Sequence, residues 1–425
     1  MMEKRQKRIL VLALFAGEIM MRSGAEIYRV EDTIVRICRA CDIPYVECFA
    51  TTTGIFLSLD GGQDGDMHTF IKRIHSINTD LDKISRINRF SRAFTSTDLS
   101  VEEGFQQLRA IDRIGPYSLP ANLAGAIFIG FSLCMSFGGG ILDSVFCALI
   151  SAAAYLASMF VEKLRINAFV STFLSCAACT LLSVLTLESG LGSALSPIII
   201  ASITMFLPGV AITNAARDML SGDMLSGVAR LSEALIRAIA IACGVGAVLK
   251  VWSLAGGGLP YEDMIVYPMY MFFIFGFLTT FGFCIQFHVP GRQMAPASLV
   301  GALGFCLYEY VLIDRGGSVI FAALVASGLV AALAEFFSRA GKDATTLFII
   351  PGIIPLVPGT GMYITMTYVM QSDFANVAES GTRTFITAGG IAVALVIVAS
   401  ISRLLMATAA RIGDAAASAK KKGSG

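Results

Sequence analysis

Charged and apolar positions are distributed unevenly along this chain, and the pattern changes near Pro116–Pro120. The residues before this point mix the two kinds of position as soluble domains do. The rest of the chain holds ten long apolar stretches, and an apolar run of about 18 or more residues can cross a bilayer as a helix. The expected spans are residues 119–137, 141–161, 166–187, 194–216, 232–254, 266–287, 296–313, 318–337, 345–370 and 384–405.

This pattern predicts an α-helical integral membrane protein with about ten transmembrane helices, preceded by an α+β domain that we call the head. We expect four parts in all. They are the head at residues 1–116, a first five-helix membrane module at 117–255, a second five-helix membrane module at 256–412, and a disordered basic tail at 413–425.

Residues 1–41 predict one long amphipathic helix. Apolar residues recur on one helical face from Ile27 to Cys41, and Pro44 ends the pattern. The basic start followed by apolar residues is similar to a signal peptide. Its apolar core is short and interrupted by Glu18, so we interpret this segment as part of the helix rather than as a targeting sequence.

Residues 45–59 are rich in Thr, Val and aromatic residues and predict a strand, and residues 68–74 could return beside it as a hairpin. The acidic segment 60–66 between them lacks the EF-hand spacing, so we interpret it as a solvated turn rather than a calcium site. The sequence further predicts helices at residues 79–94 and 100–114 and a capping box of Ser100 and Glu103.

Each membrane module carries a Pro-Gly pair in the fourth of its five spans. Moving residues 196–238 along the chain by 150 positions places Pro208-Gly209 on Pro358-Gly359. Because five is an odd number, two such modules in succession have opposite orientations. The sequence therefore predicts two inverted five-helix repeats, an arrangement typical of secondary transporters.

Loop charge predicts the orientation in the membrane. Lys and Arg are concentrated in the loops on the side of the head, whereas Glu188, Asp373 and Glu379 fall on the opposite side, so both termini are expected in the cytoplasm. Charged residues make up 15% of the chain, below the roughly one quarter of soluble proteins. With a net charge of +1 and no basic patch outside the loops and the head, nucleic acid is excluded as a partner, and the lipid bilayer is the expected surroundings.

The chain shows no pattern of an enzyme, a metal site or a cofactor site. Seven of the ten cysteines fall in apolar runs, and no His lies close in sequence to either C-x-x-C pair, at 38–41 and 176–179, so we explain them by packing. The chain has no phosphate loop, and neither H-E-x-x-H nor G-x-S-x-G occurs. Transport driven by a gradient is the function that remains.

The Pro-Gly pairs predict where a substrate binds. Proline removes a backbone donor and glycine tolerates unusual φ, so the helix unwinds there and frees backbone groups. Each restarted helix also presents a positive N-terminal dipole that suits a carboxylate. The candidate substrate-binding residues are Pro208, Gly209, Asn214, Arg217, Asp218, Pro358, Gly359, Thr360 and Tyr363.

Three carboxylates in or near the spans are candidates for proton coupling, because an ionisable group inside a membrane is costly and usually functional. They are Glu309, Glu335 and Asp143. Each has a structural alternative. Glu335 and Asp143 lie near span ends, where they could simply reach lipid headgroups, and Glu309 could pair with Arg315.

Two long motifs carry a family resemblance. The segment GEIMMRSGAEIYRVEDTIVRICRACDI at 17–43 resembles the opening helix of the threonine/serine exporter family, and PGIIPLVPGTGMY at 351–363 resembles the hallmark of that family's second module. Gly17, Gly24, Arg29 and Glu31 are pattern positions of the first motif. We expect the two glycines to allow close helix packing, and Arg29 and Glu31 to make buried polar contacts within the head.

The resemblance implies export of a small carboxylate-bearing metabolite (threonine, serine or a dicarboxylate such as succinate) across a bacterial plasma (inner) membrane, driven by the proton motive force. Two rival functions remain open. A passive channel or facilitator could not move substrate against its gradient, and a membrane sensor would use the head as its output domain. The small-residue spans would also allow close contacts between copies, so the sequence permits a homo-oligomer.

Overall fold

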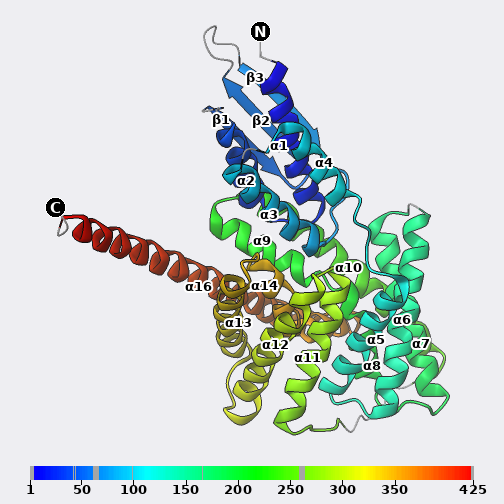
Figure 1. Ribbon diagram of the computed structural model, residues 1–425. Helices are drawn as coiled ribbons and strands as arrows, with labels where there is room; N and C mark the ends of the chain where they lie inside the picture. The colour runs from blue at the N-terminus through cyan, green and yellow to red at the C-terminus, as the bar shows by residue number, and fades with distance from the viewer. Residues whose placement is uncertain are drawn as a thin grey trace.

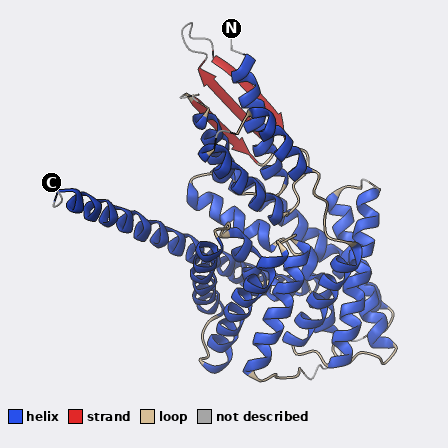
Figure 2. Ribbon diagram, in the orientation of Figure 1, coloured by secondary structure: helices blue, strands red, loops and turns tan. Residues whose placement is uncertain are grey.

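The computed structural model describes residues 4–41, 43, 45–60, 67–97, 99–164, 166–257 and 264–422. A head of helices and a small sheet stands on one face of a larger helical part (Figures 1 and 2). We call this face the head side and the opposite face the far side. The head consists of α1 (Lys4–Arg22), α2 (Ile27–Ala40), β1 (Val46–Thr51), β2 (Gly54–Asp60), β3 (Met67–Arg73), α3 (Leu81–Ser96) and α4 (Val101–Asp112).

The prediction of a single long N-terminal helix is wrong, because the chain bends between α1 and α2. Gly24 has a φ of +80°, in the left-handed region that favours glycine, and the helix ends there. Gly17 does allow close packing, since a Cβ there would lie 2.5 Å from Cδ1 of Ile34 on α2. The bend folds α1 and α2 against each other, and both pack into the apolar core of the head.

The sheet has the antiparallel order β1-β2-β3. The predicted hairpin is present as β2 and β3, but the predicted strand at 45–59 is two strands, separated by a turn between Thr51 and Gly54. The residues that point inward from β2, such as Ile55 and Leu57, are fully buried. The acidic turn at 61–66, with most of the rejected calcium cluster, lies outside the described residues.

The predicted helices that close the head are confirmed as α3 and α4. The Asp80 side chain caps α3 by accepting a hydrogen bond from the Lys83 amide at 3.0 Å. The capping box of Ser100 and Glu103 at the start of α4 is formed in full. Burial raises the pKa of the Cys38 thiol on α2 to about 12, so this thiol stays protonated at neutral pH and acts as a small apolar side chain.

The membrane part contains eight helices long and apolar enough to span a bilayer, or up to ten if each of two bent helix pairs is one span, within the described residues. The first module holds α5 (Leu119–Ser136), α6 (Ile141–Lys163), α7 (Ala168–Glu188), the broken span α8 (Leu195–Ile203), η1 (Thr204–Phe206) and α9 (Gly209–Ser221), and α10 (Met224–Leu254). The second holds α11 (Met269–Gln286), α12 (Gly291–Glu309) with η2 (Tyr310–Asp314), α13 (Val319–Gly341), the broken span α14 (Thr346–Ile353), η3 (Ile354–Leu356) and α15 (Gly359–Met370), and α16 (Phe374–Lys422).

Two helices extend beyond the predicted spans. The helix α10 begins at Met224 rather than 232, and α16 begins at Phe374 rather than 384. The added residues, 224–231 and 374–383, include charged side chains such as Arg230 and Arg383, which average hydropathy places outside a span. At its other end α16 continues as helix to Lys422, past residue 413, where we expected a disordered tail to begin.

The elements of the two modules correspond one to one. The helices α5, α6, α9 and α10 each begin 150 residues before α11, α12, α15 and α16, and η1 and η3 have the same separation. The corresponding helices α5 and α11 run antiparallel. Asn122, near the start of α5, contacts Gln286 at the end of α11, and Ser132, near the end of α5, contacts Thr279 further back in α11. The residue numbers of the partners therefore fall along α11 as they rise along α5.

We expect Gly24→Ala to lower the free energy of unfolding by about 1 kcal/mol, because an L side chain is strained at this φ. The new Cβ would also lie 3.1 Å from the Asn78 carbonyl oxygen. Gly115→Ala is the matched control, since no atom lies within 4 Å of a Cβ there. Thermal unfolding of the detergent-solubilised protein measures both variants. Equal melting temperatures would mean that the bend tolerates a side chain.

Candidate functional site

The two helix breaks meet at the centre of the membrane part and enclose a cavity. The span α8–α9 bends by 56° at its break, and α14–α15 bends by 42°. A cavity of about 360 Å³ is lined from the first break by Pro208 and Gly209 and from the second by Val357 and Gly359. Head residues, among them Gly24 and Thr79, also line it, so this head-side cavity runs from the breaks to the underside of the head.

The breaks pack against each other reciprocally. A Cβ on Gly209 would lie 2.7 Å from Cγ1 of Val357, and a Cβ on Gly359 would lie 2.7 Å from Cδ1 of Leu207. Leu207 and Val357 are 150 residues apart, as are the two glycines. Each module therefore inserts the residue before its Pro-Gly pair against the glycine of the other, and only glycine leaves room for that approach.

A second cavity of about 480 Å³ lies beyond the breaks, and no described residue of the head lines it. It shares Phe137, Pro355 and Val357 with the head-side cavity, so these residues separate the two spaces. Glu309 and Arg383 supply charge to this far-side cavity. The paired breaks thus lie between the head-side cavity and the far-side cavity.

The predicted substrate residues divide between these places. Pro208, Gly209, Asn214 and Gly359 line the head-side cavity, while Pro358 and Thr360 line the far-side cavity. Tyr363 is buried and lines neither. It borders an apolar groove formed with Ile212 and Leu231.

Arg217 and Asp218 are held in ion pairs beneath the head. Arg217 pairs with Glu26 of the head, and Asp218 Oδ2 lies 3.0 Å from Arg230 Nε on α10. Arg230 also donates from Nη2 to the Ala25 carbonyl oxygen at 3.1 Å. Neither Arg230 nor Glu26 was predicted as a functional residue, because neither shows a sequence motif with its partner.

The three candidate carboxylates occupy different surroundings. Glu309 lines the far-side cavity, half-buried, and no hydrogen bond or ion pair reaches it from the described part of the chain. Glu335 accepts a hydrogen bond from Ser402 at 2.9 Å and lies 3.5 Å from Arg339.

Asp143 is buried and makes structural contacts on the far side. It accepts hydrogen bonds from the amides of Gly140 at 2.9 Å and Ser193 at 2.7 Å, and from the Ser193 hydroxyl at 2.8 Å. These bonds fasten the start of α6 to the loop before α8. The arrangement satisfies the carboxylate within the protein, away from lipid headgroups.

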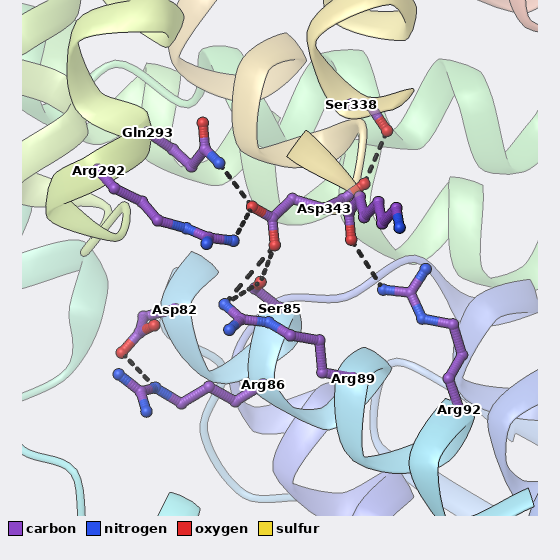
Figure 3. Close-up of polar contacts among 10 residues, drawn as sticks. Asp82, Ser85, Arg86, Arg89, Arg92, Arg292, Gln293, Ser338 and Asp343 are labelled. Atoms are coloured by element: carbon purple, nitrogen blue, oxygen red, sulfur yellow. Dashed lines mark hydrogen bonds and ion pairs between the residues drawn. The ribbon is translucent and has the colours of Figure 1, made fainter. Parts of the chain in front are cut away.

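On the head side, a buried carboxylate that the sequence analysis missed joins the head to the second module (Figure 3). The side chain of Asp343 is fully buried and accepts from Arg292 Nη2 and Gln293 Nε2, each at 2.6 Å. From α3 of the head, the Ser85 hydroxyl donates to it at 3.3 Å, and Arg89 lies 3.6 Å away. Two elements of the second module and one of the head therefore meet at one carboxylate.

The 150-residue separation could have revealed this carboxylate. Gln293 stands 150 residues after Asp143, and Asp343 stands 150 residues after Ser193. In both modules a hydrogen bond joins the side chain near the start of the second helix to the loop before the broken span. The carboxylate is on the helix in the first module, as Asp143, and on the loop in the second module, as Asp343. In the second module the carboxylate is on the loop, where the head can also reach it.

Glu31 and Arg29, two pattern residues of the opening motif, both make polar contacts. Glu31 accepts a hydrogen bond from the Ala50 amide at 2.8 Å, within the head as expected. Arg29 also makes the expected contact within the head, since its Nη1 lies 3.6 Å from Oε2 of Glu26. The same nitrogen donates to the Thr346 hydroxyl of α14 in the membrane part at 2.9 Å, a contact that the expectation did not include. Among the described residues, no group of three or more His, Cys, Asp or Glu side chains could hold a metal ion.

Comparison with known families matches the chain in two consecutive parts. The family model described as "Putative threonine/serine exporter" matches residues 11–252, and the one described as "Threonine/Serine exporter, ThrE" matches residues 272–401. The first match thus covers the head and the first module, and the second covers most of the second module.

Individual relatives show the same relation at low identity. The chain is 22% identical to a "Threonine/serine exporter" of Corynebacterium glutamicum, over 93% of this chain and 83% of the relative. It is 22% identical to a "Probable threonine/serine exporter" of Mycobacterium tuberculosis, over 84% and 69%. It is 24% identical to a "Probable succinate transporter subunit YjjP" of Escherichia coli, over 60% of this chain and 99% of the relative. No solved structure matches the chain.

We expect Asp343→Ala to destabilise the protein by about 2–3 kcal/mol, because it leaves buried donors without their acceptor. Thermal unfolding in detergent, with limited proteolysis of the head, measures the loss. Glu102→Ala is the control, since Glu102 forms an exposed ion pair with Arg8 at the surface of the head. A melting temperature as high as that of the control would show that the head does not depend on this carboxylate.

Proposed function

The chain belongs to the threonine/serine exporter family, and on that premise we propose that it is a secondary active exporter of a small carboxylate-bearing metabolite. The substrate would be threonine, serine or a dicarboxylate such as succinate, and the proton motive force would drive its export across the plasma membrane. The relatives whose names carry these substrates align with most of this chain or with about 60% of it.

The observation that carries this proposal is the pair of cavities on opposite sides of two packed helix breaks. A carrier must expose one binding site to each side in turn, and a narrow barrier between two vestibules is what such a mechanism needs. The barrier here consists of a few side chains, including Val357, which packs against Gly209 of the other module. A small relative movement of the modules would move this barrier.

We further infer that the modules are inverted repeats. The uniform 150-residue separation of their elements and the antiparallel course of α5 and α11 support this relation. The broken spans are then equivalent, each entering the membrane from a different side. The short contact of Leu207 with Gly359, matched by that of Val357 with Gly209, is the contact that a pseudo-twofold axis between the breaks would generate.

The head side is proposed to face the cytoplasm, with both termini there. Arg292, Arg339 and Lys342 lie in or beside the head-side loops, and Arg92 of the head donates to the Lys342 carbonyl oxygen at 3.2 Å. The far-side ends of the helices carry acidic residues such as Glu188 and Asp373. Loops rich in Lys and Arg are generally retained in the cytoplasm, and this rule supports the proposed orientation.

The substrate carboxylate is proposed to bind where the helices restart. The helices α9 and α15 begin at Gly209 and Gly359, both of which border the head-side cavity. The first amides of a helix have no intrahelical acceptor and carry the positive end of the dipole. Asn214, buried on α9, adds a neutral hydrogen-bonding group to the same cavity.

Counterflow in proteoliposomes tests the proposal. Vesicles preloaded with threonine, serine or succinate would take up the same labelled compound faster than empty vesicles, and an imposed pH gradient would drive net transport. Exchange with one preload names the substrate class. Flux that runs only down its gradient would instead indicate a passive channel, and no exchange from correctly inserted protein would contradict the transport function.

Glu309 is proposed as the proton carrier, since a carboxylate that has no partner among the described residues and lines a membrane cavity is free to exchange protons with water. We expect Glu309→Gln to lose acceleration by the pH gradient while keeping counterflow, because exchange needs no net proton movement. Glu335→Gln is the matched control, since Ser402 and Arg339 already engage that carboxylate. Undiminished acceleration in Glu309→Gln would assign the coupling to another group.

A further inference from the structure

The turn between α1 and α2 lies where both broken spans reach the head side. Glu26, at the start of α2, is almost fully buried, with 3% of its side chain exposed. It pairs with Arg217 near the end of α9. One residue of the head thus touches the broken span of the first module directly.

The same residue is linked to the broken span of the second module. Arg29 Nη1 lies 3.6 Å from Glu26 Oε2 and donates at 2.9 Å to Oγ1 of Thr346, the first residue of α14. The side chains of Arg217, Glu26, Arg29 and Thr346 therefore form one polar line from α9 to α14. We call this line the bridge.

A second contact beside the bridge also holds the first module to the turn. Arg230 of α10 binds both Asp218 and the Ala25 carbonyl oxygen. Burying such charges carries a desolvation penalty that apolar packing would avoid, so buried ion pairs are weak devices for stability alone. Charged contacts can, however, be exchanged for water when the elements separate.

The bridge lies next to the head-side cavity. Gly24, two residues before Glu26, lines that cavity, and so does Arg230. Any widening between α9 and α14 that admits a solute must increase the distance from Arg217 to Thr346. The bridge cannot span that distance and remain whole, so it must break at one of its links.

The joints of the head indicate which link breaks. On the second module, α3 is held by the Asp343 contacts and by two backbone bonds, from the Leu81 amide to the Phe287 carbonyl oxygen at 2.9 Å and from the Asp82 amide to the His288 carbonyl oxygen at 3.0 Å. On the first module, the turn is held by the Glu26 and Ala25 contacts described above. The weaker joint of the head is therefore with the first module.

We propose that Glu26 is the gating residue of the head side. Its pairing with Arg217 closes the head-side cavity, and its release lets the head move away from α9 and α10 together with the second module. This inference rests on the proposed transport function and assigns the head a direct part in alternating access. Glu26 is a positioning residue, because it acts through the two broken spans rather than on the substrate.

Thiol labelling of a cavity residue tests the gate without any substrate. Asn214→Cys places a reporter in the head-side cavity, and a membrane-impermeant thiol reagent is applied to the head side of full-length protein in vesicles. The background of native cysteines is taken from the same protein without the reporter. We expect Glu26→Gln to raise the labelling rate about tenfold, equivalent to a shift of about 1.4 kcal/mol toward the open state.

Arg217→Gln removes the other partner of the same ion pair and should raise the labelling rate by the same factor. If both act through one contact, the double variant Glu26→Gln/Arg217→Gln labels no faster than either single variant. Asp32→Asn is the matched control, because Asp32 forms an exposed ion pair with Arg36 on the same helix. Protease protection of the head confirms that each variant is folded.

Unchanged labelling in folded Glu26→Gln and Arg217→Gln would overturn the gate. Additive increases would overturn it too, since they would mean that the two residues loosen the protein independently. Faster, non-additive labelling in a protein that exchanges no tested substrate would leave the gate standing and contradict the transport function instead.

Discussion

A backbone that leaves helical geometry inside a membrane must be covered by protein or by water, because lipid offers its amides and carbonyls no partners. This constraint explains the centre of the molecule. Each broken span is tolerated because the other covers it, through the reciprocal insertion of Leu207 and Val357 against the glycines of the opposite break. Residues of both breaks also line the two cavities. Neither module could keep its break in lipid alone, so the modules depend on each other.

The head completes this dependence from one face of the membrane part. In sequence it precedes the first module and is matched with that module by one family model. In space its helix α3 binds the second module through Asp343, while the turn near Glu26 reaches both broken spans. The head therefore connects two halves that are otherwise joined within the membrane. Its charged residues lie mainly at these contacts or at its surface, and its interior is apolar.

The local features of the fold could be predicted from the sequence. The spans, the two breaks and the caps of α3 and α4 follow from hydropathy, Pro-Gly pairs and capping residues, which act within a few positions. The bend at Gly24 was missed because helical periodicity continues on both sides of it. The contacts of Glu26 and Arg29 join residues 191 and 317 positions apart, and no local pattern encodes such pairs. Arg217 and Asp218 were predicted as substrate-binding residues, but their ion-pair partners could only come from the folded chain.

The exchange of the acidic residue between Asp143–Ser193 and Gln293–Asp343 has a consequence for the polarity of the molecule. Two modules alike in length and element order, arranged as the proposed inverted repeats, would by themselves build a body with equivalent ends. At one end the loop carries serine, and its hydrogen bonds are used up within the module. At the other end the loop carries aspartate, which still accepts from Ser85 of the head. A single relocated carboxylate thus makes the two ends chemically distinct and gives a nearly symmetric body a top and a bottom.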